Sequence, residues 1–157
     1  MKFLHTADLQ IGACFAQFGA QADILRKARL RTLGRVLDIA ADRGVDAVLV
    51  AGDLFESNQV SNSLAQEAFR LFEARPDVHV VILPGNHDPL SSPASVWSRK
   101  PFSEPPPHLT VCTSSIPVQL RDAVILPVPI TQKNSTKDPS LPLVEMAANA
   151  PAGKIRV

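Results

Sequence analysis

Short apolar runs alternate with longer amphipathic segments in the first half of the chain. Residues 47–51 and 78–83 are largely apolar runs of strand length, and residues 2–6 are expected to form a first short strand. Between them, residues 20–43 and 64–72 carry apolar side chains at spacings of three and four, which is typical of a helix with one buried face. The order strand-helix-strand-helix-strand predicts a parallel sheet with right-handed crossover connections.

Both expected helices have recognisable ends. Gly44 ends the first helix, because glycine accepts the left-handed conformation that closes many helices. Ser63 and Gln66 have the spacing of a capping box at the start of the second helix, which should end before Pro76.

Regular elements become shorter after Asp88, where proline and serine are frequent. A long irregular loop is expected over residues 89–107, and its Trp97 and Phe102 either anchor the loop on the body of the protein or face a substrate; anchoring is preferred. Three short strands are then expected to form a second sheet: residues 109–112, 117–120 and 123–128. A loop, a short helix and the start of a strand follow: residues 131–138, 143–149 and 154–157.

Polar side chains with metal-binding potential follow each of the three expected parallel strands. Asp8 follows the first strand, Asp53 the second, and Asn86, His87 and Asp88 the third. Carboxyl ends of neighbouring parallel strands lie at one edge of a sheet, so these side chains should converge. Carboxylate and amide oxygens beside an imidazole predict a hard-metal site suited to phosphoester hydrolysis.

Two divalent ions about 3.5–4 Å apart need a carboxylate that bridges them. Asp53 is the candidate bridge, since Gly52 before it permits a tight turn. Asp8 would hold the first ion and the amide oxygen of Asn86 the second. Oxygen-rich ligation with some imidazole favours Mn²⁺, with Mg²⁺, Fe and Zn²⁺ as alternatives.

Three segments of the chain carry a family resemblance. Residues 3–12, 50–56 and 83–89 contain, in order, Asp-x-Gln, Gly-Asp-x-x-Glu and Gly-Asn-His-Asp. This order resembles the calcineurin-like metallophosphoesterases, and the flanking residues resemble the SbcD-type DNA repair exonuclease subunit, over residues 1 to about 130. The resemblance implies an α/β fold, an α-β-β-α sandwich with a parallel βαβαβ core and a second sheet.

The resemblance also implies roles for individual residues. His87 would stabilise the transition state or protonate the leaving oxygen, and Asp88 would orient His87. Gln10 stands where most of the superfamily has a metal-binding histidine, so the first ion should be held more loosely. Apart from the resemblance, Glu56 is a candidate outer hydrogen-bonding partner of the site.

Further family histidines, in Gly-His words downstream, have no counterpart in this sequence. The expected organisation is therefore one metallophosphoesterase domain over residues 1–157 that stops before its C-terminal metal-binding motifs. Such a chain should have little activity alone. Its second metal site should be incomplete.

The charge of the chain says little about whether it binds nucleic acid. The net charge is +1, which gives no global argument for nucleic acid. Five basic residues on the first helix could face a phosphate backbone, although an ordinary solvated face is the preferred interpretation; they are Arg26, Lys27, Arg29, Arg31 and Arg35.

Cys14 and Cys112 are far apart and suggest neither a disulfide framework nor a zinc site. No membrane span or signal-peptide core is visible, so the cytoplasm is the expected location.

Three functions remain open at this point. The preferred hypothesis is a metal-dependent nuclease acting on DNA ends in double-strand break repair, which by resemblance works with an SbcC-type coiled-coil ATPase; a homodimer is also compatible. A small-molecule phosphodiesterase or phosphatase could use the same metal core. A non-catalytic truncated scaffold module is the third hypothesis.

Overall fold

Four parallel strands form the sheet that carries the candidate site. In the computed structural model, which describes residues 1–91, 94–134 and 138–157, their order is β1-β2-β3-β4. The strands are β1 (Phe3–Thr6), β2 (Ala47–Ala51), β3 (Val80–Leu83) and β4 (Leu109–Val111). Their carboxyl ends lie at one edge, as the βαβαβ prediction requires.

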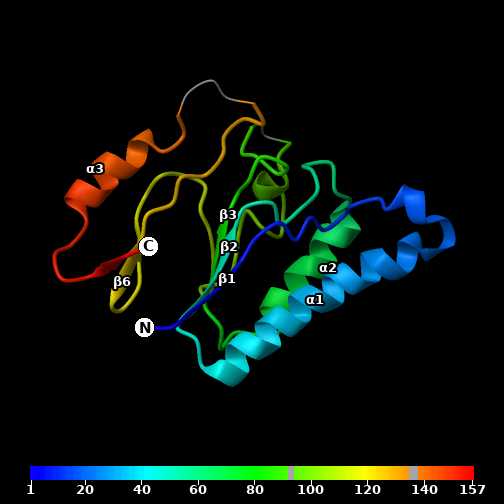
Figure 1. Cartoon of the computed structure of the whole chain (residues 1–157), viewed down its shortest axis with the longest axis horizontal. Helices are drawn as coiled ribbons and strands as arrows, with labels where there is room; N and C mark the ends of the chain where they lie inside the picture. Colours follow the sequence, from blue (N-terminus) through cyan, green and yellow to red (C-terminus); the bar gives the residue numbers. More distant parts are fainter. Residues whose placement is uncertain (92–93, 135–137) are drawn as a thin grey trace.

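Two helices cover one face of this sheet (Figure 1). They are α1 (Ala22–Arg43), preceded by the 3₁₀ segment η1 (Ala16–Gln21), and α2 (Asn62–Glu73). Gly44 ends α1 in the left-handed conformation, with φ of 53°, which confirms the predicted helix end.

The start of α2 differs from the prediction. Ser61, not Ser63, is the N-cap: its backbone is extended and its hydroxyl accepts a hydrogen bond from the Leu64 amide at 3.2 Å. Ser63 already lies inside the helix, where its own backbone is helical. The predicted capping box of Ser63 with Gln66 is therefore wrong, because the helix begins two residues earlier.

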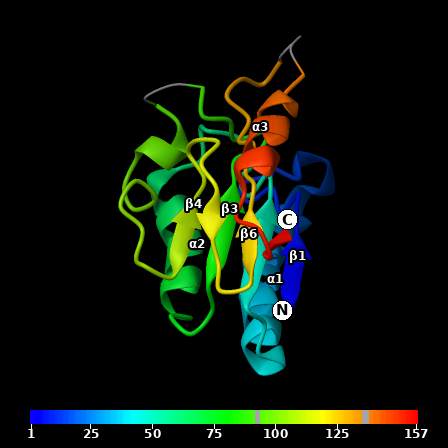
Figure 2. The same ribbon diagram turned by 90° about the vertical axis from the view of Figure 1, so that its left-hand side faces the viewer.

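A second, smaller sheet lies on the opposite face (Figure 2). It contains β5 (Val118–Gln119), β6 (Ala123–Ile125) and β7 (Ile155–Arg156), in that order, with α3 (Leu141–Asn149) between β6 and β7 in the chain. The fold is thus mixed α/β with two sheets, consistent with a metallophosphoesterase fold.

The strand predicted at residues 109–112 belongs to the other sheet. It pairs with β3 as β4, with the Val80 amide bonded to the His108 carbonyl at 2.8 Å and the Cys112 amide bonded to the Ile82 carbonyl at 2.9 Å. Assignment to the second sheet was wrong, because Leu109 is buried with the helices and completes the parallel sheet at its edge.

Alternating strand residues divide the interior into two cores. Val48, Val50, Val80 and Ile82 face the helices, whereas Leu49, Val81 and Leu83 pack with Cys112 and Ile125 between the two sheets. Period-two alternation on a buried strand explains this division. Burial on both faces also explains why β2 and β3 are continuous apolar runs in the sequence.

Trp97 and Phe102 anchor the long loop after Asp88, as preferred from the sequence. Trp97, in the 3₁₀ segment η2 (Val96–Ser98), and Phe102 are almost fully buried. The Phe102 ring centroid lies 5.5 Å from that of Phe55, 5.2 Å from that of Phe69 and 5.4 Å from that of Trp97. This aromatic cluster fixes the loop next to the segment that follows β2.

Truncation of this anchor should be costly. We expect Phe102→Ala to lower the free energy of unfolding by about 3–5 kcal/mol, because it leaves a cavity among three aromatic rings. Urea denaturation followed by tryptophan fluorescence measures the change. Phe18→Ala, at a half-exposed ring, is the matched control and should change stability by less than about 0.5 kcal/mol. Equal effects of the two substitutions would contradict the anchoring role.

Expectations from the sequence also concern the two cysteines and membrane spans. Cys14 and Cys112 are both free, Cys112 buried and Cys14 exposed. Across the described ranges, no helix has the length and apolar character needed to cross a membrane. The predicted loop at 131–138 and the proline-serine segment include residues 135–137 and 92–93, which lie outside the described residues.

Candidate metal centre

Parallel pairing of β1 and β2 continues into the loops beyond them. The Asp8 amide donates to the Gly52 carbonyl at 3.2 Å, the Gln10 amide to the Asp53 carbonyl at 2.9 Å, and the Ile11 amide to the Leu54 carbonyl at 2.9 Å. These bonds place Asp8 and Gln10 directly beside Asp53. Two of the three predicted strand ends are thereby joined through their backbones.

Three of the predicted metal ligands have left-handed backbones. The φ angles are 54° at Asp8, 43° at Gln10 and 54° at Asp53. Residues other than glycine rarely adopt this region, and the conformation costs on the order of 1 kcal/mol or more at each position. Such strain persists where surrounding contacts impose it, and it clusters at functional sites.

The third strand end meets Asp53 through the turn after β3. The His87 amide donates to the Asp53 carboxylate oxygen Oδ1 at 2.9 Å. Gly85 lies so close that a Cβ atom there would be 2.1 Å from the same oxygen and 2.5 Å from the Asp53 amide nitrogen. Asp53 is buried at this junction, with 8% of its surface exposed. Glycine at position 85 is thus required by close approach to Asp53.

Gly85→Ala should therefore disturb the site directly. The added methyl group must displace the Asp53 carboxylate or the turn, so we expect the free energy of unfolding to fall by about 1–3 kcal/mol and Mn²⁺ affinity to fall by about tenfold or more. Calorimetric Mn²⁺ titration and urea denaturation measure both. Gly34→Ala is the control, since a Cβ there meets only Leu71 at an ordinary 3.8 Å. Unchanged Mn²⁺ affinity in the folded Gly85→Ala protein would contradict the prediction.

The Asp88 side chain lies between the turn after β3 and the loop after β2. Its carboxylate accepts a hydrogen bond from the Gly85 amide at 2.7 Å and another from the Phe55 amide at 2.9 Å. The side chain is fully buried, and burial raises the pKa of Asp88 to about 6, although the two amide hydrogen bonds act in the opposite direction. Because each carboxylate oxygen accepts a hydrogen bond from a backbone amide, Asp88 joins the turn after β3 to the loop after β2. That Asp88 orients His87 stays a prediction.

Glu56 is the neighbour of the His87 ring. Nδ1 of His87 lies 3.0 Å from the Glu56 carbonyl oxygen and 3.6 Å from the Glu56 carboxylate. A proton on Nδ1 can be donated to that carbonyl, which leaves Nε2 for exchange with a substrate. The sequence indicates Glu56 only as an outer hydrogen-bonding partner of the site and does not predict its contact with the His87 ring.

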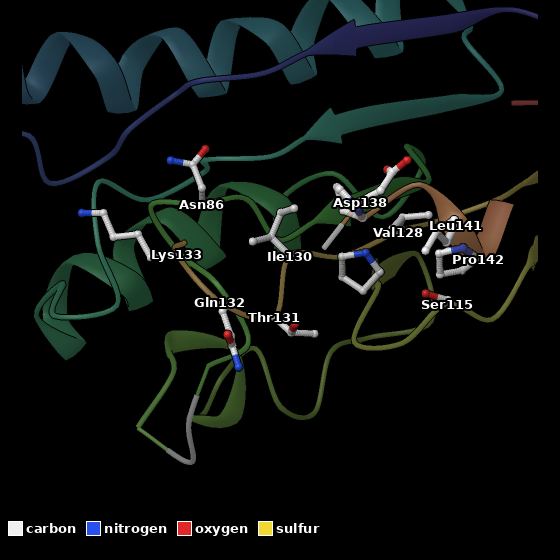
Figure 3. Close-up of a pocket in the computed structure, with 12 residues that line it drawn as sticks. Asn86, Ser115, Val128, Ile130, Thr131, Gln132, Lys133, Asp138, Leu141 and Pro142 are labelled. Carbon is white, nitrogen blue, oxygen red and sulfur yellow. The ribbon is translucent and has the colours of Figure 1, made fainter. Parts of the chain in front are cut away.

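Asn86 is exposed and lines a cavity of about 500 Å³ (Figure 3). Figure 3 places Asn86 and Lys133 at one end of this cavity and Asp138 and Leu141 at the other. The cavity walls come mainly from the segment after β6 and the start of α3. A substrate group beside Asn86 would therefore also contact residues that the sequence did not single out.

The donor set fits a divalent ion only in part. Asp8 and Asp53 supply carboxylates, and Gln10 and Asn86 can supply amide oxygens, which suits a hard cation. Among the residues that the structure describes, however, no three His, Cys, Asp or Glu side chains form a cluster that could hold a metal ion. At this site the described residues thus offer fewer charged donors than a pair of divalent ions requires.

Comparison with known proteins gives matches over most of the chain. The calcineurin-like phosphoesterase family matches residues 1–131. The SbcD component of the SbcCD nuclease of Rhodobacter capsulatus is 36% identical over 61% of this chain and 24% of that protein. The corresponding SbcD proteins of Escherichia coli K12 and Bacillus subtilis are 30% and 31% identical, over 59% and 56% of this chain and 22% of each protein. The chain spans about a quarter of the length of these relatives.

A solved structure, nuclease MPE of Pseudomonas putida, is similar with a TM-score of 0.45 and 17% identity, over 79% of this chain and 52% of that one. The family match is the broader finding, because it covers all three strand ends of the site. On this evidence the chain belongs to the calcineurin-like phosphoesterase family.

Proposed function

We propose that this chain carries a metal-dependent phosphodiesterase site that cleaves DNA. The observation that supports it most is the junction of three strand ends at Asp53, with left-handed backbones at Asp8, Gln10 and Asp53 itself. Strain held in place by neighbouring loops is typical of a preorganised site.

Asp8, Gln10, Asp53 and Asn86 would hold the metal, with Asp53 central because it contacts both neighbouring loops. Mn²⁺ is the preferred ion, with Mg²⁺, Fe and Zn²⁺ as alternatives. When bound, divalent ions supply Lewis acidity toward a phosphate oxygen and lower the pKa of water. With two carboxylates available, one ion should bind firmly and a second weakly, so we expect low turnover from the 157-residue chain.

His87 would act on the leaving oxygen. Its Nδ1 faces the Glu56 carbonyl, and its ring is about one-third exposed, so Nε2 can reach a bound phosphodiester. A positioned imidazole of this kind contributes as a general acid.

The substrate and partners follow from the relatives only as proposals. Their names describe one subunit of a nuclease, which supports a nucleic acid as substrate and a second protein as partner. We propose DNA ends as that substrate. We propose an SbcC-type coiled-coil ATPase for that partner, a role in double-strand break repair and a cytoplasmic location. A homodimer is the alternative assembly.

A small-molecule phosphodiester is the second candidate substrate. The cavity of about 500 Å³ beside Asn86 has the size of a ligand pocket and supports this alternative. Both candidate substrates would use the same metal donors, so the residues that surround those donors determine which substrate binds.

Metal binding and hydrolysis test the proposal together. Mn²⁺ binding is measured by calorimetry, and cleavage is followed at excess protein with end-labelled duplex DNA and with bis(p-nitrophenyl) phosphate. We expect Mn²⁺-dependent cleavage that Asp8→Asn removes and that Asp77→Asn, an exposed aspartate before β3, retains. Cleavage of the small ester alone would favour the second candidate. Absence of both Mn²⁺ binding and cleavage would overturn the proposal in favour of a non-catalytic module.

A further inference from the structure

Arg29 lies half-buried on α1 and reaches the loop that carries Asp8 and Gln10. Its Nη1 donates to the Leu9 carbonyl at 2.6 Å and lies 3.5 Å from the Gln10 carbonyl. Its guanidinium carbon lies 4.9 Å from the centroid of the Phe15 ring. The sequence placed Arg29 with four other basic residues on a solvated helix face, and those four are exposed.

These contacts fall on an unusually strained segment. Asp8, Gln10 and Phe15 all have left-handed backbones. Arg29 contacts the Leu9 carbonyl, which precedes Gln10, and the ring of Phe15. On the other side of the same segment, the Gln10 amide is bonded to the Asp53 carbonyl at 2.9 Å. Residues 9–10 are therefore held between α1 and the loop after β2.

A charged donor is well suited to this position. Hydrogen bonds from a guanidinium are stronger than those between neutral groups, so they offset part of the cost of the left-handed conformation. The planar fork of arginine can contact two carbonyls and an aromatic ring together, which a lysine ammonium cannot do in the same geometry.

We propose that Arg29 is a positioning residue, which fixes the Leu9-Gln10 segment, with Gln10 in its left-handed conformation, and so aims Asp8 and Gln10 at the metal site. This inference rests on the proposed function for its metal consequence. Its conformational consequence, a fixed Leu9-Gln10 segment, does not depend on any metal.

Arg29→Met and Arg29→Lys test the inference, with Arg35→Met, an exposed arginine on the same helix, as the control. Without metal, we expect Arg29→Met to speed hydrogen exchange of the Gln10 amide about tenfold or more, because the hydrogen bond from α1 to the Leu9 carbonyl is lost. Exchange at Val50 inside β2 should not change, which separates the effect from general destabilisation. Arg29→Lys should exchange at an intermediate rate.

With Mn²⁺, we expect Arg29→Met to weaken binding by about 10–100-fold, while Arg35→Met binds like the original protein. Unchanged Gln10 exchange in Arg29→Met would overturn the inference whatever the metal result. Faster exchange with unchanged Mn²⁺ affinity would remove the proposed link to the metal site. Failure of the unsubstituted protein to bind Mn²⁺ would overturn the proposed function, and with it the metal half of the inference, while the exchange result still decides the conformational half.

Discussion

Replacement of Asp53 by asparagine is expected to abolish metal binding and hydrolysis together. Asparagine keeps the shape of the side chain and an oxygen that can accept the hydrogen bond from the His87 amide. The junction of the loops should therefore remain intact. The central negative charge is lost, and with it the strongest donor between the strand ends. We expect Mn²⁺ affinity to fall by more than about 100-fold, beyond the effect typical of an outer partner.

Calorimetric titration with Mn²⁺ and single-turnover hydrolysis of bis(p-nitrophenyl) phosphate measure this outcome. Asp77→Asn provides the matched control, because it makes the same chemical change at an exposed position away from the strand carboxyl ends. Unchanged Mn²⁺ affinity in Asp53→Asn would show that the metal site lies elsewhere.

The second large effect concerns His87. Removal of its imidazole should lower single-turnover hydrolysis by about 10²–10⁴-fold, the range of a positioned acid-base group, and leave Mn²⁺ binding largely intact. Its ring contacts Glu56, whereas its backbone amide, which alanine retains, holds Asp53. Chemistry and metal binding should therefore separate in His87→Ala, in contrast to Asp53→Asn.

Metal content measured beside the rate distinguishes the possible roles of this histidine. Loss of Mn²⁺ from His87→Ala would identify the ring as a ligand, and an unchanged rate would exclude it from the chemistry. His5→Ala, at an exposed histidine within β1, should alter neither quantity.

Much of the fold was predictable because each element follows from local chemistry. The periodicity of residues 20–43 and the glycine at 44 correspond to α1 and its left-handed end. The strands expected at residues 2–6, 47–51 and 78–83 correspond to β1, β2 and β3. The strand at residues 109–112 was found but assigned to the wrong sheet, since a three-residue strand carries no information about its neighbour.

Site residues were harder to place than elements. The family resemblance named Asp88 as the residue that orients His87, and it could not show that the Asp88 carboxylate accepts hydrogen bonds from two backbone amides or that the Glu56 carbonyl lies beside the ring. Arg29 shares its charge and helix with exposed residues, and its half-burial and its contacts with the Leu9 carbonyl and the Phe15 ring separate it from them.

The sequence by itself determined which elements form and which polar groups follow the parallel strands, because helix periodicity, strand length and turn residues act over a few neighbouring positions. Only the tertiary structure decided which of those groups meet. Contacts such as His87 amide to Asp53, Gln10 amide to the Asp53 carbonyl, and Arg29 to Leu9 join residues 20–43 positions apart. Their geometry depends on sheet register, helix packing and strained backbone angles, which are set by the whole fold and leave no local pattern in the chain.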